Sequence, residues 1–284
     1  MKKKKVAVIQ FPGTNCEFET ARALESAGIS STIFRWNENH ERLIQCDGYV
    51  LAGGFSYQDR VRAGVVASKD RLLDALKKEA KKGKPVLGIC NGAQILVEAG
   101  MVPDISREKP ELALAPNIMK KNGHIVRRDY YCAWVFVKVS SPKTLCAFTR
   151  CFQDNEIFPV PVAHGEGRFV TKDKAVKRAL HQKHLVAFQY CTPQGETLAD
   201  FPVNPNGAMF NAAGIMNKKG NVLAFMPHPE RANFLYQVPS PLPGNWSERK
   251  KALKKSTLSS FFPGPGRKFF LSMKDYMEHY HVER

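Results

Sequence analysis

The sequence predicts an α/β protein whose central sheet is mostly parallel and covered by helices on both faces. Through the first hundred residues, short apolar segments alternate with helix-forming segments, which is the order of parallel strands joined by crossover helices. The apolar segments are unbroken runs, as in strands buried on both faces. With 284 residues, 43% of them hydrophobic, the chain can bury a large core. We therefore expect a single domain over residues 1–284.

The first two expected helices have recognisable ends and faces. Thr14 and Glu17 have the spacing of a capping box, and Gly28 is a residue that typically ends a helix. Leu72 and Leu76 share one face of the second helix. In chain order, we expect a strand at 6–10, a helix that the capping box at 14–17 begins and Gly28 ends, strands at 31–34 and 49–52, a helix at 68–82, a strand at 85–89 and a helix at 93–99.

The second half of the chain is richer in strands, and we expect mixed pairing at the edges of the sheet. Residues 237–266 contain five prolines around a basic core, which indicates a surface insertion. We expect it to help dock a protein partner. A closing amphipathic helix follows at 269–276. The strands expected here are 130–139, 160–170, 186–190, 214–217 and 222–226.

Composition and charge limit the class of protein. The net charge of +17 raises nucleic-acid binding as an alternative, since Lys and Arg contacts to phosphate drive such affinity. Many of the basic residues fall in short runs without a nucleic-acid-binding motif between them, so we expect solvated surface or docking to an acidic protein partner. Seven cysteines without C-x-x-C pairs, and no apolar segment long enough to target or span a membrane, indicate a cytoplasmic protein. No metal-ligand spacing is visible.

Cys90 is the expected nucleophile. It stands between Gly88 and Gly92 where an apolar run gives way to a helix-forming run. A sharp strand-to-helix turn leaves no room for Cβ atoms beside the nucleophile, which explains the two glycines. A helix N-terminus also favours the thiolate form of a cysteine. We expect the other six cysteines to be packing residues.

Two segments could supply the base that a cysteine nucleophile needs. His164 and His228 are each followed two residues later by a carboxylate, Glu166 and Glu230. His228 follows an expected buried strand and would emerge at the same sheet edge as Cys90, so position favours it. Position alone does not exclude His164 as the base.

Acyl transfer also needs donors for the oxyanion. The N–H of Asn91, directly after the nucleophile, is one candidate. The second comes from the loop over residues 53–56, where we expect the backbone of Gly54 and Phe55 to contribute.

Five ordered motifs resemble the class I, triad-type glutamine amidotransferase family, and within it the glutaminase subunits of phosphoribosylformylglycinamidine synthases. The motif G-x-C-x-G followed by H-x-E is the hallmark of the wider family. The resemblance spans residues 6–232, and Ala52 and Gln58 depart from it at positions where the family commonly has proline and glycine. The motifs are residues 11–17, 53–57 with 62–64, 88–94, 163–167 and 227–231.

The resemblance implies a flavodoxin-like class I glutaminase fold and a set of roles. Cys90 would attack glutamine, His228 would shuttle the proton, and Glu230 would orient His228. Gln94 would contact the substrate, as would His164 and Gly165 from the pocket wall.

The resemblance also implies where the ammonia goes. A larger synthetase subunit would consume it with ATP and Mg²⁺ to convert formylglycinamide ribonucleotide to the formylglycinamidine in purine biosynthesis, and a third small subunit is common. No cofactor is expected in this chain. Another triad hydrolase or amidotransferase, acting on a different acyl substrate, is the alternative enzyme.

Overall fold

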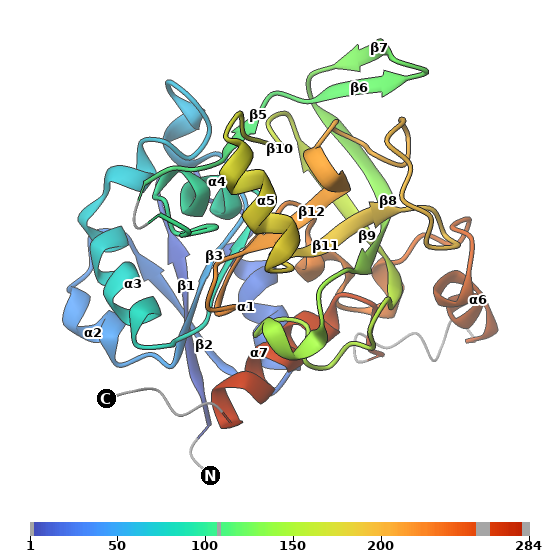
Figure 1. Cartoon of the computed structure of the whole chain (residues 1–284). Coiled ribbons are helices and arrows are strands. Elements are labelled where there is room, and N and C mark those ends of the chain that lie inside the picture. Colours follow the sequence, from blue (N-terminus) through green and yellow to red (C-terminus); the bar gives the residue numbers. More distant parts are fainter. Residues whose placement is uncertain (1–2, 107–108, 254–261, 280–284) are drawn as a thin grey trace.

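A nine-stranded sheet forms the centre of the computed structural model, which describes residues 3–106, 109–253 and 262–279. The strand order is β2-β1-β3-β4-β13-β12-β11-β8-β9 (Figure 1). The strands are β1 (Lys5–Gln10), β2 (Ser30–Arg35), β3 (Gly48–Leu51), β4 (Val86–Ile89), β8 (Tyr131–Val139), β9 (Ile157–His164), β11 (Val186–Cys191), β12 (Ala212–Met216) and β13 (Val222–Phe225).

The sheet has a parallel half and an antiparallel half. From β2 to β13 neighbouring strands pair in parallel, and from β13 to β9 they pair antiparallel. Every residue of β3, β4 and β13 is buried, as the unbroken apolar runs predicted. The predicted α/β class is confirmed, and so is the mixed pairing at one edge.

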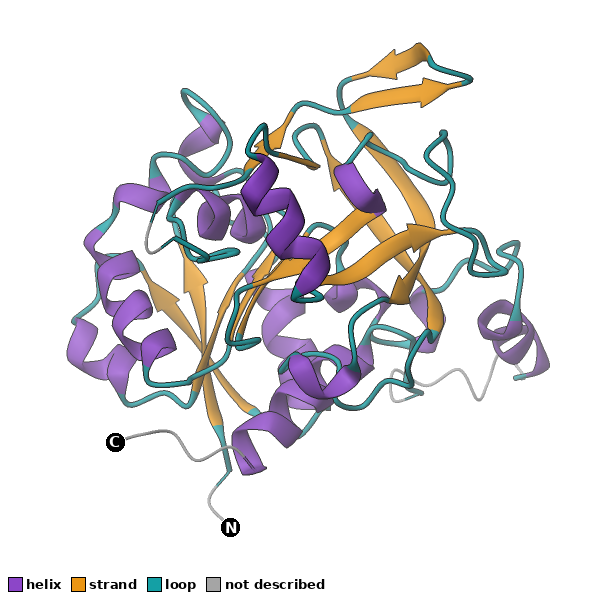
Figure 2. Cartoon of the chain, viewed as in Figure 1, coloured by secondary structure: helices purple, strands orange, loops and turns teal. Residues whose placement is uncertain are grey.

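Helices cover both faces of the sheet (Figure 2). The β1-to-β2 and β3-to-β4 crossovers leave in opposite directions, so right-handed connections put α1 and α3 on opposite faces. The closing helix α7 contacts α1 and so lies on the same face. The helices are α1 (Glu17–Ser26), α2 (His40–Ile44), α3 (Arg71–Lys81), α4 (Asn91–Glu98), α5 (Lys174–Gln182), α6 (Asn245–Ala252) and α7 (Arg267–His279).

Two small sheets lie outside the central one. β5 (Ala113–Ala115) pairs with β10 (Arg168–Val170), and β6 (Ile118–Lys121) pairs with β7 (His124–Arg128). The β6–β7 hairpin projects from the body of the molecule in Figure 1. It precedes β8, whose first residue is opposite the last residue of β9.

The carboxyl ends of several strands meet at one edge of the sheet. Phe225 of β13 is in register with Ile89 of β4, and Leu51 of β3 is opposite Gly88. Four antiparallel pairings separate β13 from β9, so β9 runs in the same direction and ends at this edge with His164. Segments that are far apart in sequence therefore converge where open α/β sheets place their sites.

The first helix differs from its prediction at the N-terminus. Cys16 is the N-cap, and it makes no side-chain cap hydrogen bond. The Thr14 hydroxyl instead accepts from the Phe11 N–H within the preceding loop. The predicted capping box is therefore wrong, because this loop folds back on itself before the helix begins.

The predicted insertion contains the helix α6. A 3-10 turn at Leu235–Gln237 precedes α6, and Pro263, which follows it, pairs with Phe234 in an isolated bridge. Residues 254–261 of the insertion lie outside the described part of the chain. Across the three described ranges, every helix is too short or too polar to cross a bilayer.

Candidate active site

Cys90 lies on a tight turn between β4 and α4. Its backbone has φ 50° and ψ −106°, a conformation that non-glycine residues rarely adopt. A Cβ on Gly88 would lie 2.5 Å from the carbonyl oxygen of Gly92, and one on Gly92 would lie 2.0 Å from that of Leu51. The two glycines are therefore required by close packing around the turn, as the sequence predicted.

His228 and Glu230 form a buried pair directly after β13. Nδ1 of His228 is 2.6 Å from Oε1 of Glu230, and both side chains are almost fully buried. Burial opposes protonation of His228, but the Glu230 carboxylate and then Cys90 outweigh it and raise the His228 pKa well above its ordinary value. Nε2 of His228 is buried without a hydrogen-bond partner in the described part of the chain, which leaves it available to the thiol.

His164 has no such carboxylate partner. Its two ring nitrogens are buried and make no hydrogen bond to any described residue. Burial, together with nearby His228, lowers its pKa to about 3, so the ring is neutral at physiological pH. Glu166 turns elsewhere, with Oε2 3.4 Å from the Ala63 N–H. The geometry thus favours His228 over His164 as the base.

A pocket of about 170 Å³ opens in front of Cys90. The three residues predicted to bind substrate, Gln94, His164 and Gly165, all line it. Nε2 of Gln94 donates to the Glu166 carbonyl oxygen at 2.8 Å, which ties α4 to the wall formed after β9. The Cys90 thiol donates to the carbonyl of Ala163 in the same wall at 3.6 Å.

The loop after β3 carries both residues that were predicted to donate to the oxyanion, Gly54 and Phe55. The Phe55 N–H donates to the Gly13 carbonyl at 2.9 Å, so the Phe55 prediction is not supported in this conformation. Gly54 and Phe55 both line the pocket, and Asn91 begins α4. Gln58 has a left-handed φ of 59°, which explains why glycine would suit its position.

Asn91 holds this loop with its side chain. Oδ1 accepts from the Ser56 N–H at 3.0 Å, and Nδ2 donates to Oδ1 of Asp59 at 3.1 Å and to Oε1 of Gln94 at 2.9 Å. The residue after the nucleophile therefore fixes both the loop and the side chain of Gln94.

Sequence reasoning missed Asp59 in the pocket and considered Glu166 only as a partner of His164. Asp59 and Glu166 both line the pocket, as do Tyr130 and Ala63. Burial and the charge of Glu166 raise the pKa of Asp59 to about 6, against the opposing hydrogen bond from Asn91. Two nearby carboxylates suit a cationic group of a ligand. Asp59 follows the motif at residues 53–57, but only the loop geometry places it near Glu166.

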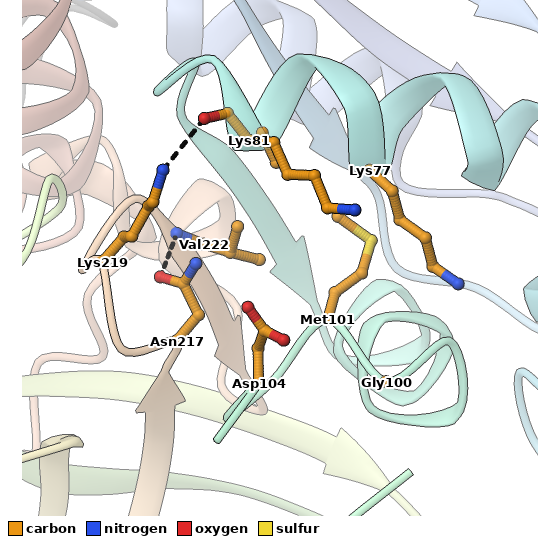
Figure 3. Close-up of a pocket in the computed structure, with 9 residues that line it drawn as sticks. Lys77, Lys81, Gly100, Met101, Asp104, Asn217, Lys219 and Val222 are labelled. Carbon is orange, nitrogen blue, oxygen red and sulfur yellow. Dashed lines mark hydrogen bonds between the residues drawn. The ribbon is translucent and has the colours of Figure 1, made fainter. Parts of the chain in front are cut away.

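A smaller cavity, of about 50 Å³, lies at the opposite edge of the sheet (Figure 3). Lys219 donates there to the carbonyl of Lys81, and Asn217 accepts from the Val222 N–H. Its lining residues include no cysteine or histidine. We therefore take the pocket at Cys90, which has a nucleophile and a base, as the candidate active site.

The chain is similar to known proteins in sequence and in fold. Residues 3–262 match the family model of the CobB/CobQ-like glutamine amidotransferase domain. The chain belongs to the glutamine amidotransferase family.

Relatives of this amidotransferase are similar over nearly its whole length. It is 48% identical over 274 residues to phosphoribosylformylglycinamidine synthase subunit PurQ of Methanothrix thermoacetophila, covering 96% of this chain and 98% of the relative. It is 38% identical over 232 residues to PurQ of Pyrococcus furiosus, covering 82% and 91%. A chain in the structure of PurLQS from Thermotoga maritima has a TM-score of 0.67 and 28% identity, with 97% and 99% covered.

Proposed function

We propose that this chain is the glutaminase subunit of a phosphoribosylformylglycinamidine synthase. It hydrolyses glutamine to glutamate and ammonia and supplies the ammonia for formylglycinamidine ribonucleotide synthesis. The observation that carries the proposal is the buried His228–Glu230 pair beside Cys90, in a chain 48% identical to a PurQ subunit over almost all of both lengths.

The proposed chemistry begins with a proton transfer. Nε2 of His228 takes the proton from Cys90, and the thiolate attacks the side-chain amide carbon of glutamine. Glu230 holds Nδ1 and stabilises the imidazolium. The backbone N–H groups of Asn91 and Gly54 then stabilise the oxyanion, each donor being worth about 3 kcal/mol.

The same residues complete the reaction. The tetrahedral intermediate collapses, the C–N bond breaks, and His228 gives its proton to the departing ammonia. Water then attacks the glutamyl thioester with His228 as base, which releases glutamate and restores the thiol. Neutral His164 faces the reacting amide from the pocket wall. Asp59 and Glu166 face the α-ammonium group of glutamine.

The partner follows from the proposed reaction. A synthetase subunit consumes the ammonia and holds the ATP and Mg²⁺, and a third small subunit joins them, as the name PurLQS suggests for the Thermotoga maritima assembly. We place the complex in the cytoplasm, and the seven free cysteines support a reducing compartment. The insertion over 237–266 remains a predicted docking element.

Glutamate release from glutamine tests the function. We expect the chain mixed with its cognate synthetase subunit, ATP, Mg²⁺ and formylglycinamide ribonucleotide to release glutamate and form the amidine. Cys90→Ala should abolish both, while free ammonia should restore amidine formation. If the wild-type mixture leaves glutamine untouched and works only with free ammonia, the proposal is wrong.

Glutamine capture should weaken in mild acid. With the Asp59 pKa raised to about 6, its carboxylate is charged above that pH and neutral below it. Loss of a charge-assisted hydrogen bond costs about 1.5–3 kcal/mol, so kcat/KM should fall roughly 10-fold or more below pH 6. Asp59→Asn should have a low kcat/KM without this acid limb. An unchanged limb in the variant would assign it to another group.

A further inference from the structure

Cys16 is buried against the proposed catalytic pair. It is 2% exposed, and it caps no helix N–H although it occupies the N-cap of α1. Ligand atoms of Cys16, His228 and Glu230 all lie within 4.8 Å of one another. The sequence assigned this residue to ordinary packing.

Gly53 makes room for this contact. A Cβ on Gly53 would lie 3.2 Å from Sγ of Cys16 and 2.8 Å from Cε1 of His228. It would also lie 3.4 Å from Nδ1, the nitrogen that Glu230 holds. Gly53 therefore leaves room for Sγ of Cys16 to lie close to the imidazole that Glu230 holds.

Arg231 contacts the same sulfur. Its Nη2 donates to Sγ of Cys16 at 3.1 Å and lies 3.5 Å from Oε1 of Glu19. Burial opposes the charge of Arg231, but the nearby carboxylates of Glu230 and Glu19 help to raise its pKa. The sulfur of Cys16 therefore connects the Arg231 guanidinium to the buried His228–Glu230 pair. In this pair, Oε2 of Glu230 has no hydrogen-bond partner among the described residues.

We propose that Cys16 is a positioning residue, which holds the Arg231 guanidinium beside the His228–Glu230 pair and fixes the imidazole that serves Cys90. This inference rests on the proposed function for its kinetic consequences. Burial raises the Cys16 pKa, so it stays a thiol at neutral pH and leaves the nucleophile's role to Cys90. Cys16 accepts from Arg231 through its sulfur and packs on the ring.

Two substitutions separate positioning from packing. Cys16→Ala removes the acceptor, and we expect kcat for glutamate release to fall about 10-fold, the loss of about 1.4 kcal/mol, with KM changed less than about 2-fold. Cys16→Ser keeps an acceptor for Arg231 and should recover most of kcat. Cys46→Ala is the matched control, since Cys46 is also buried but contacts the Arg42 carbonyl. An equal loss in this control would refute the proposal.

Alkylation of Cys90 by iodoacetamide gives a readout that needs no glutamine. Without Cys16 the His228 imidazole loses a packing partner and the Arg231 guanidinium loses its sulfur acceptor. Alkylation of Cys90 at neutral pH should therefore be slower in Cys16→Ala than in wild type, and slowed less in Cys16→Ser. An unchanged rate overturns the proposal even if the chain proves to act on another substrate.

A double-mutant cycle with Arg231→Ala tests the link itself. If both residues act through one contact, the double variant should lose no more than the larger single loss. Fully additive losses would show that Cys16 and Arg231 act separately, which would also overturn the proposal.

Discussion

Replacing Glu230 by glutamine should reduce kcat for glutamine hydrolysis by about 10³-fold or more. Burial lowers the pKa of His228, and the Glu230 carboxylate is the largest influence that raises it. A neutral amide at 2.6 Å from Nδ1 cannot stabilise the imidazolium that forms during attack. KM should change little because Glu230 does not line the pocket. Steady-state glutamate release measures both constants.

Glu166→Gln is the matched control, because it makes the same chemical change in the competing H-x-E segment. Glu166 lines the pocket with Asp59, so this variant should raise KM and keep kcat within about 10-fold of wild type, since one charge-assisted contact is lost. The opposite pattern, in which Glu166→Gln loses kcat and Glu230→Gln does not, would make His164 the base and remove the proposed triad.

Local sequence was enough to predict the turn at Cys90. The steric requirement for Gly88 arises within five residues, because its Cβ would meet the carbonyl of Gly92. Gly92 was predictable from the turn alone, although the atom that excludes a Cβ there belongs to Leu51 of β3. The buried strands were also predictable, because apolar runs such as that of β4 depend on local composition. Element ends were less predictable, as the failed capping box at Thr14 shows.

The choice between His164 and His228 needed the structure. Each is followed by a carboxylate at the same spacing, and only the fold shows that Glu230 turns toward its histidine while Glu166 turns toward Ala63. Pro229 between His228 and Glu230 begins a 3-10 turn, whereas His164 ends a strand. The same H-x-E spacing therefore gives a histidine–carboxylate contact at His228 but not at His164, because the backbone conformation of the two segments differs.

Contacts between loops account for what sequence reasoning missed. Cys16 follows β1, and its contacts with the His228 pair follow from the convergence of strands at one edge. Asp59 reaches the pocket through consecutive left-handed residues, including Gln58, that no propensity favours. The Phe55 N–H, a predicted oxyanion donor, instead donates to the Gly13 carbonyl. Such pairings depend on register and loop path rather than on composition.

Gly92→Ala should destabilise the fold and abolish activity together. In an open helix this change stabilises by about 1 kcal/mol. Here the new Cβ would lie 2.0 Å from the Leu51 carbonyl oxygen and 2.6 Å from its carbon, which belong to the buried strand β3. Neither backbone can yield without separating α4 from the sheet, so we expect a net loss of about 3 kcal/mol or more.

Thermal unfolding at a fixed scan rate checks this expectation, with a midpoint roughly 6–12 °C below wild type. Gly165→Ala is the control for stability, since the nearest atoms to its added Cβ lie 4.0 Å away and its midpoint should stay near wild type. Because α4 carries Asn91 and begins at the nucleophile, its displacement would also move the oxyanion donor and Cys90. A stable and fully active Gly92→Ala would show that close packing does not hold the nucleophile turn in place.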